Sequence, residues 1–78
     1  MLTSAQCRAA RGLLDWSQQY LAHKAGVGIV TVRQFEAGKG EARRATLAVI
    51  RLALEAWGVE FTNGDQPGVR LRKPGRKT

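Results

Sequence analysis

The stretch from Gln18 to Ala37 constrains the fold of this chain more than any other. Apolar residues recur at helical spacing on both sides of Gly26, which places them on one face of each helix. Gly26 stands where the first helix has to end in a left-handed residue, a conformation that glycine adopts at little cost. These apolar residues are Leu21, Ala22 and Ala25 before the glycine and Val32 and Phe35 after it, and Val27 is the apolar residue of the turn. The pattern predicts two short helices, Gln18–Ala25 and Gly28–Glu36, that cross steeply at a tight turn.

Two further helices are predicted on either side of this pair. Thr3 and Ser4 are good N-cap residues, and they precede a helix predicted over about Ala5–Leu14. A fourth helix is predicted to begin near Thr46 and to end at Gly58. Its amphipathic stripe, which we expect to pack in the core, contains Leu47, Ile50, Leu54 and Trp57, widened by Val49, Leu52 and Ala53.

After the fourth helix the period of the sequence changes from helix to strand. Val59–Thr62 and Val69–Arg72 alternate apolar and polar residues on either side of a segment rich in turn formers, which predicts a β-hairpin. An isolated hairpin is marginal in water, so we expect it to pack on the fourth helix, to pair with another subunit, or both. The residues expected on its apolar face are Val59, Phe61, Val69 and Leu71. We therefore divide the chain into a helical domain (1–58), a packing or dimerisation hairpin (59–73) and a disordered basic tail (74–78).

The charge of the chain indicates a polyanionic partner. Its 78 residues include 13 Lys and Arg against 6 Asp and Glu, which gives a net charge of +7 and a pI near 10.9. This excess favours nucleic acid, although charge alone does not separate DNA from RNA or from an acidic membrane. Hydrophobic residues make up 44% of the chain and many of them are alanine, so the core is expected to be thin. A thin core favours self-association, because association buries further apolar surface.

The sequence argues against an enzyme, a metalloprotein and a membrane protein. It has no nucleophile–base constellation, no Gly-rich phosphate loop and no useful pair of carboxylates, and His23 is its only histidine. No apolar run approaches the ~18 residues of a transmembrane helix, and we expect no signal peptide. The single Cys7 is expected to be a small buried hydrophobe in a reduced, cytoplasmic protein. We therefore expect no catalytic residue, metal or cofactor.

The central helix pair carries a family resemblance. Its motif residues are Ser17-Gln18, Leu21-Ala22, Ala25-Gly26-Val27, Thr31-Val32 and Phe35-Glu36 with Gly38. On these residues the chain resembles the Cro/C1-type helix-turn-helix family of phage-repressor-like regulators, over about Leu2 to Trp57. The resemblance implies a mainly α, compact four-helix domain of the lambda-repressor type. It also implies sequence-specific binding to double-stranded DNA.

The resemblance assigns roles to particular residues. The third helix would be the recognition helix in the major groove. Its implied base-reading residues are Gly28, Ile29, Val30, Arg33 and Gln34. The implied phosphate contacts are Ser17 and Gln18 at the start of the second helix, Thr31 in the third, and Lys39, Arg43 and Arg44 in the loop after it. Arg11 and Glu36 match a pair that forms a structural salt bridge between the first helix and the end of the third in this family.

The recognition helix departs from the family pattern at its start. Gly28 replaces a hydroxyl residue, and the next two positions, Ile29 and Val30, are β-branched and apolar where polar residues are common. We expect both side chains to be exposed; they cannot hydrogen-bond a base, but they can contact thymine methyl groups. We expect a homodimeric repressor on a palindromic operator. The alternative is a protein-interaction module, such as an antitoxin or a phage accessory regulator, in which these apolar residues contact a protein partner.

Overall fold

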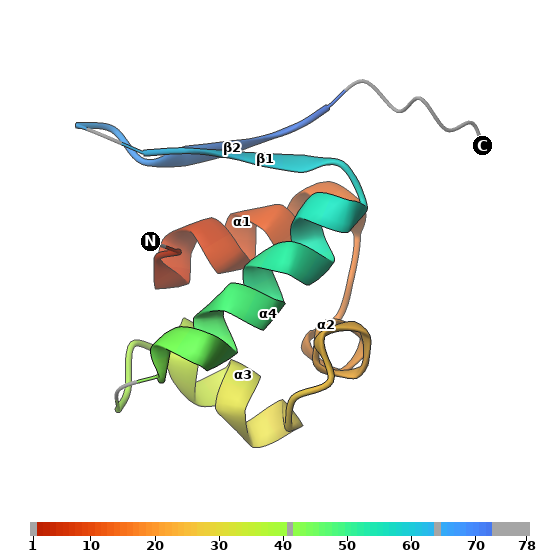
Figure 1. The fold of residues 1–78 in the computed structure, drawn as a ribbon, viewed down its shortest axis with the longest axis vertical. Coiled ribbons are helices and arrows are strands. Elements are labelled where there is room, and N and C mark those ends of the chain that lie inside the picture. Colours follow the sequence, from red (N-terminus) through yellow and green to blue (C-terminus); the bar gives the residue numbers. More distant parts are fainter. Residues whose placement is uncertain (1, 41, 64, 73–78) are drawn as a thin grey trace.

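The computed structural model describes residues 2–40, 42–63 and 65–72, and within them four helices precede a two-stranded antiparallel hairpin (Figure 1). The elements are α1 (Ser4–Leu14), α2 (Gln18–Ala25), α3 (Ile29–Glu36), α4 (Arg44–Ala56), β1 (Val59–Thr62) and β2 (Gly68–Leu71). The hairpin lies across one end of the helices and α3 lies at the opposite end, with α4 between them (Figure 1). The predicted four-helix fold with a C-terminal hairpin is confirmed. The tail predicted over residues 74–78 lies outside the described residues.

Local hydrogen bonds set the starts of the first two helices. The Oγ1 atom of Thr3 accepts a hydrogen bond from the backbone N–H of Gln6 at 3.0 Å, and the Gln6 side chain accepts one from the Thr3 N–H at 3.0 Å. This capping box satisfies two backbone donors that a helix start otherwise leaves free. At the start of α2, Ser17 Oγ accepts from the Tyr20 N–H at 2.9 Å. The predicted N-cap at Thr3 is therefore confirmed.

The start of α4 differs from the prediction. The helix begins at Arg44, two residues before the expected Thr46, and Arg43 is its N-cap residue. Arg and Ala are strong helix formers, and nothing in residues 44–46 prevents a helix. Arg44 therefore lies in the first turn of α4 and not in the preceding loop, whereas Lys39 and Arg43 do lie in that loop.

The buried stripe of α4 is narrower than predicted. Leu47, Ile50 and Leu54 are buried, but Val49 and Leu52 are exposed, and Trp57 is half exposed beyond the end of the helix. Val49 and Leu52 fall on the side of the helix opposite to the buried leucines and isoleucine, because each residue advances about 100° around the axis. The prediction that they widen the buried stripe is wrong.

The core gathers side chains from all four helices and from the first strand. The largest fully buried side chains are Leu21, Ile50, Leu54, Val32, Val59 and Cys7. Ala10 lies beside Cys7 in α1 and is also fully buried, as expected where small side chains allow helices to pack closely. Cys7 is therefore the buried hydrophobe that the sequence predicts.

The hairpin packs on its own helices. Val59 pairs with Leu71 and Phe61 pairs with Val69, so these four side chains share one face, as predicted. Val59 is only 1% exposed, and Phe61 and Val69 pack against the core, whereas Leu71 remains 39% exposed. The second strand begins at Gly68, one residue earlier than predicted. The hairpin therefore buries most of its apolar face against α1 and α4 of the same chain.

A buried glutamine joins α1 to the hairpin. The Gln6 Nε2 atom donates to the carbonyl oxygens of Thr62 and Gly68, both at 3.0 Å, while its Oε1 atom accepts from Thr3. Gln6 is only 3% exposed, so these contacts satisfy a polar group that is costly to bury alone. One side chain therefore caps α1 and holds both strands at the turn end of the hairpin.

Replacing Gln6 with alanine is expected to lower the free energy of unfolding by about 1–3 kcal/mol, because it removes three hydrogen bonds and leaves a cavity. Urea unfolding followed by circular dichroism measures the loss. The matched control is Gln19→Ala on the exposed side of α2, which is expected to change stability by less than ~0.5 kcal/mol. Equal effects of the two substitutions would contradict the anchoring role of Gln6.

Candidate nucleic-acid interface

The turn between α2 and α3 has the predicted left-handed glycine. Gly26 ends α2 with a φ of 73°, in the left-handed region that favours glycine. The next backbone N–H, that of Val27, donates to the Ala22 carbonyl at 3.0 Å. Leu21 and Val32 are fully buried on the facing sides of the two helices. The left-handed conformation of Gly26 and the buried contact side of the two helices together fix the position of α3 on α2.

The outward face of α3 presents three of the five predicted base-reading residues. Val30 is 55% exposed, and Arg33 and Gln34 are also exposed. Positions 30, 33 and 34 are separated by three and four residues, so they lie on one side of the helix. Gly28 is exposed as the N-cap residue of α3, and no side chain caps this helix start.

The remaining predicted reader, Ile29, does not lie on that exposed face. It is half-buried and packs against the core. The reason is its position three residues before the buried Val32, which places both side chains on the same side of α3. The expectation that Ile29 and Val30 are both exposed is wrong for Ile29, and Val30 is the large apolar side chain that the outward face presents.

The start of α2 faces the end of α3 through Gln18. Ser17 is exposed, with its hydroxyl oxygen bound to the Tyr20 N–H. Gln18 is half-buried, and its Nε2 atom donates to Oε1 of Glu36 at 3.0 Å. A side-chain amide has two N–H donors, so one of them stays available to a phosphate oxygen. Glu36 thus holds the amide of Gln18 in place at the helix start.

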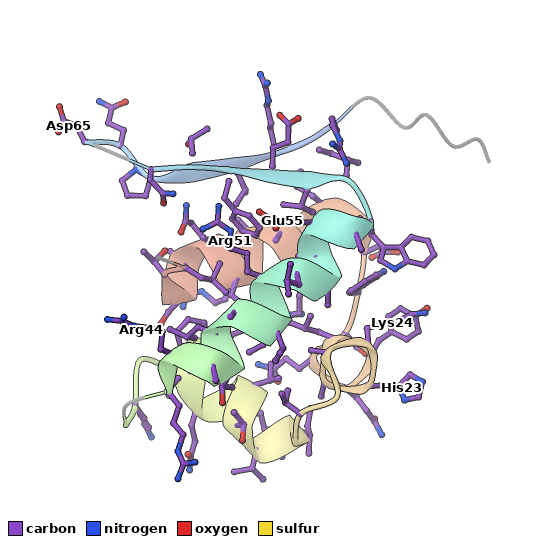
Figure 2. All side chains as sticks on the ribbon, viewed as in Figure 1. His23, Lys24, Arg44, Arg51, Glu55 and Asp65 are labelled. Carbon is purple, nitrogen blue, oxygen red and sulfur yellow. The ribbon has the colours of Figure 1, made fainter. Side chains whose placement is uncertain are left out.

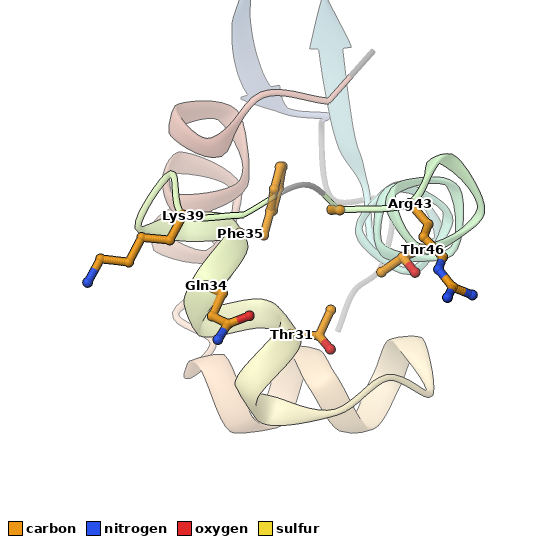
Figure 3. A pocket seen from close by; sticks show the side chains of 7 residues that line it. Thr31, Gln34, Phe35, Lys39, Arg43 and Thr46 are labelled. Atoms are coloured by element: carbon orange, nitrogen blue, oxygen red, sulfur yellow. The ribbon is translucent and has the colours of Figure 1, made fainter.

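A hollow of about 340 Å³ lies between α3 and the start of α4 (Figure 3). It is lined by Thr31, Gln34, Phe35, Lys39, Ala42, Arg43 and Thr46. The start of α4 borders it, and the side chain of its N-cap residue, Arg43, makes no capping hydrogen bond. Among the described residues, no side chain binds the first backbone N–H groups of this 13-residue helix, and N–H groups at a helix start can bind an anion. The hollow therefore combines two cationic side chains with a helix start beside the exposed face of α3.

The cations around α3 are not neutralised by described acidic groups. Arg33, Lys39, Arg43 and Arg44 are exposed, and none of them forms an ion pair with a carboxylate among the described residues. In contrast, Arg51, Arg70 and Arg72 pair with Glu55 or Glu60 near the hairpin. Arg33, Lys39 and Arg43 thus place positive charge on the α3 side of the molecule, where it can attract a polyanion, whereas Arg44 lies on the flank of α4 nearest the hairpin.

Below this surface, α1 and α3 are joined by a bidentate ion pair. The Nε and Nη2 atoms of Arg11 donate to the two carboxylate oxygens of Glu36, both at 2.7 Å. The Glu36 side chain is only 3% exposed. Arg11 also donates to the Trp16 carbonyl at 3.0 Å, in the segment between α1 and α2. The guanidinium therefore connects three parts of the helical domain.

Two more side chains converge on the same carboxylate. Gln18 donates to Oε1, and the Cys7 thiol donates to Oε2 at 3.1 Å. Sequence reasoning assigned Cys7 only to the core and Gln18 only to DNA. Neither contact has a local sequence signal, because the partners are 29 and 18 residues apart along the chain. The spacing Thr3-x-x-Gln6, by contrast, is a capping-box signal that could have revealed the other buried polar side chain.

The network changes the acidity of its members. Burial raises the pKa of the Glu36 carboxyl, but hydrogen bonds from its neighbours and the charge of Arg11 outweigh burial and lower this pKa below its ordinary value. The hydrogen bond to Glu36 raises the pKa of Arg11. Burial, followed by the contact with Glu36, raises the pKa of the Cys7 thiol well above its usual range. The site therefore holds a fixed ion pair and an unreactive thiol.

The described residues hold neither a cluster of metal ligands nor a membrane-spanning helix. Among them, no three His, Cys, Asp or Glu side chains gather as ligands for a metal ion. Nor does any helix in the described part of the chain have the length and apolar content required to cross a membrane. The chemistry of the surface is that of hydrogen-bond donors, cations and one apolar side chain around an exposed helix.

The sequence comparison agrees with this geometry. Residues 8–61, more than half of the chain, match a protein family described as helix-turn-helix, of the Cro/C1 type. The match contains the whole of α2 and α3, together with Arg11 and Glu36. No curated protein matches the sequence. The family expected from the motif residues is thus confirmed, and the chain belongs to the Cro/C1-type helix-turn-helix family of DNA-binding regulators.

Proposed function

We propose that the protein is a transcriptional repressor that binds a palindromic operator as a homodimer, with α3 in the major groove. The observation that carries this proposal is the outward face of α3, where Val30, Arg33 and Gln34 project together. A helix in the major groove reads bases with the side chains of one exposed face. Cations that form no ion pair with a described carboxylate lie on the same side of the molecule and would supply the attraction to phosphates.

Each side chain of this face suits a different base feature. Gln34 can bind adenine N6 and N7 in a bidentate manner, and Arg33 can bind guanine or a phosphate. Val30 can contact a thymine methyl group, a contact that its exposed apolar side chain can make without losing hydrogen bonds. We therefore propose an operator half-site that contains both A·T and G·C pairs, with at least one thymine methyl facing α3.

Phosphate contacts would come from both sides of α3. Gln18, fixed by Glu36, and Ser17 lie at the start of α2, and Lys39 and Arg43 lie at the hollow between α3 and α4. Such contacts position a protein on the duplex without reading sequence. Thr31, at the hollow, completes the proposed set, whereas Arg44 of the predicted set lies on the flank of α4 nearest the hairpin, away from α3.

The test compares two duplexes of equal length over a salt series: the DNA upstream of the protein's own gene and a scrambled version. We expect tight binding to the upstream duplex, retained at ~0.15 M salt, and weak binding to the scrambled duplex that falls steeply with salt. Equal, weak binding to both would contradict the repressor proposal. A protein partner that co-purified in a fixed ratio and covered Val30 would then favour the interaction-module alternative.

A further inference from the structure

The side of α4 that faces away from the core is apolar along its whole length. It consists of Ala45, Ala48, Val49, Leu52 and Ala56, which we call the outer face of α4. Spacings of three, four, seven and eleven residues from Ala45 place them on one side of the helix. Leu52 is 62% exposed and Val49 is 38% exposed. Surface helices normally carry polar and charged residues on this side, so the outer face requires an explanation.

Charged residues border the outer face but do not enter it. Arg44, Arg51 and Glu55 are separated by seven and four residues and lie along the flank of α4 nearest the hairpin (Figure 2). Arg51 pairs with Glu55 at 2.9 Å, whereas Arg44 forms no ion pair with a described carboxylate. No other described element crosses the near side of α4 (Figure 1). The arrangement is an apolar strip with a charged border, open to a partner.

The hairpin is a poor alternative surface for self-association. Val59 is only 1% exposed, and Phe61 and Val69 pack against the core. Gln6 holds the turn end of the hairpin to α1 through two carbonyl oxygens. Pairing through its apolar face would require the hairpin to leave its own helices. Of the two roles expected for the hairpin, packing is thus observed within the chain.

We propose that the outer face of α4 binds the same face of a second copy of this chain, in an antiparallel pair about a two-fold axis. This inference rests on the proposed homodimer and names its interface. Ala45 would lie against Ala56 of the partner subunit, and Val49 against Leu52 of the partner subunit, because the positions of each pair sum to the same number. Val49 and Leu52 at the centre supply the apolar surface that the pair buries, and the alanines at both ends leave room for the two helices to run side by side.

Charge complementarity supports a second copy as the occupant. In this antiparallel register the same flanks of the two helices face each other, and Arg44 of one subunit lies beside Glu55 of the other. The two-fold symmetry produces this pair twice. Each pair joins Arg44, which has no carboxylate partner among the described residues, to the half-exposed Glu55. A two-fold axis parallel to the helices would instead place the two charged flanks on opposite sides of the pair, so Arg44 of one subunit would not meet Glu55 of the other.

The same axis suits DNA binding. The hairpin and α3 lie on opposite sides of α4 (Figure 1). An axis perpendicular to α4 that brings the two hairpin-side flanks together also brings both α3 helices to the other side of the dimer. Two recognition helices on one side are what a palindromic operator requires. The apolar strip thus explains both how the subunits associate and why their reading helices face the same way.

Sedimentation equilibrium of the full chain without DNA, from ~10 μM to ~1 mM, tests the interface. We expect a wild-type dimer, and we expect Leu52→Glu to raise the dissociation constant at least ~10-fold, because it buries an unpaired charge at the centre. The matched control is Leu13→Glu on α1, where the leucine is 40% exposed, and it is expected to leave the dimer intact. Circular dichroism verifies that each variant folds.

Two further variants test the register. Arg44→Glu is expected to weaken the dimer, and the added Glu55→Arg change is expected to restore it. Leu52→Cys is expected to cross-link two subunits on oxidation, because these positions lie close to the two-fold axis. The native Cys7 is fully buried and does not compete.

The outcomes separate this inference from the proposed function. A wild-type protein that stays monomeric to ~1 mM, or a dimer that Leu52→Glu leaves intact, overturns the interface even if operator binding is specific. Conversely, a dimer that Leu52→Glu dissociates, in a protein that does not distinguish the upstream duplex from its scrambled version, supports the interface and overturns the repressor proposal.

Discussion

Replacing Glu36 with glutamine is expected to lower the free energy of unfolding by about 3–5 kcal/mol, because it breaks a buried, bidentate ion pair and leaves Arg11 without its counter-charge. The new amide also places an N–H group where the three neighbours of Glu36 all donate hydrogen bonds. For a domain of this size the loss is a large share of the total stability. Thermal unfolding followed by circular dichroism should show a melting temperature lower by at least ~12 °C.

The control for this prediction is the same substitution at an exposed ion pair. Glu60 pairs with Arg70, whose side chain is 75% exposed, so Glu60→Gln is expected to cost less than ~1 kcal/mol. The pH dependence gives a second check. A carboxyl whose pKa is lowered by folding stabilises the protein above its unfolded pKa, near 4.5, and this stabilisation is lost as pH falls through the folded pKa. The difference between wild type and Glu36→Gln should therefore narrow below pH 4.5, and a difference independent of pH would contradict the assignment.

The parts of the fold that the sequence predicts well are those determined locally. The turn at Gly26 follows from a left-handed residue between two helical patterns, and the helix start at Ser17 follows from its own side chain. The shared face of the hairpin follows from the alternation of apolar and polar residues along each strand. The observed register pairs apolar residues with apolar residues, so their side chains lie on the same face. In each case neighbouring residues carry the signal, so no knowledge of the tertiary structure is needed.

The residues whose burial was predicted wrongly are those whose exposure depends on which side of their helix the rest of the protein covers. Both sides of α4 are apolar, so periodicity alone could not show that Leu54 faces the core while Leu52 faces outward. The same holds for Ile29, which follows the core face of α3 although its neighbour Val30 is exposed. The Glu36 carboxylate contacts three residues that are distant in the sequence. The family resemblance predicted only its ion pair with Arg11. Cys7 and Gln18 join it only through tertiary packing.

The second large effect is expected at Val30, where a methyl contact can be removed from either side of the interface. On an operator duplex, Val30→Ala is expected to weaken binding by about 1–2 kcal/mol, or about 5- to 30-fold, because it removes two carbon groups from a contact with a thymine methyl group. Replacing that thymine with deoxyuridine removes only the methyl group from the DNA. The wild type should lose a similar factor on the deoxyuridine duplex, while Val30→Ala should be almost insensitive to the change.

Combining Val30→Ala with deoxyuridine isolates one contact. The two losses of binding free energy add only if the side chain and the thymine methyl group do not interact. Deoxyuridine placed outside the footprint is the control on the DNA, and it should affect neither protein. Lys39→Ala is the control on the protein: it should weaken binding to every duplex and reduce the slope of affinity with salt by about one unit, as a phosphate contact does. Additive losses from Val30→Ala and deoxyuridine at every thymine would show that Val30 reads no methyl group. Because Val30 is the large apolar side chain that α3 exposes, its outward face would then be better explained by a protein partner than by an operator.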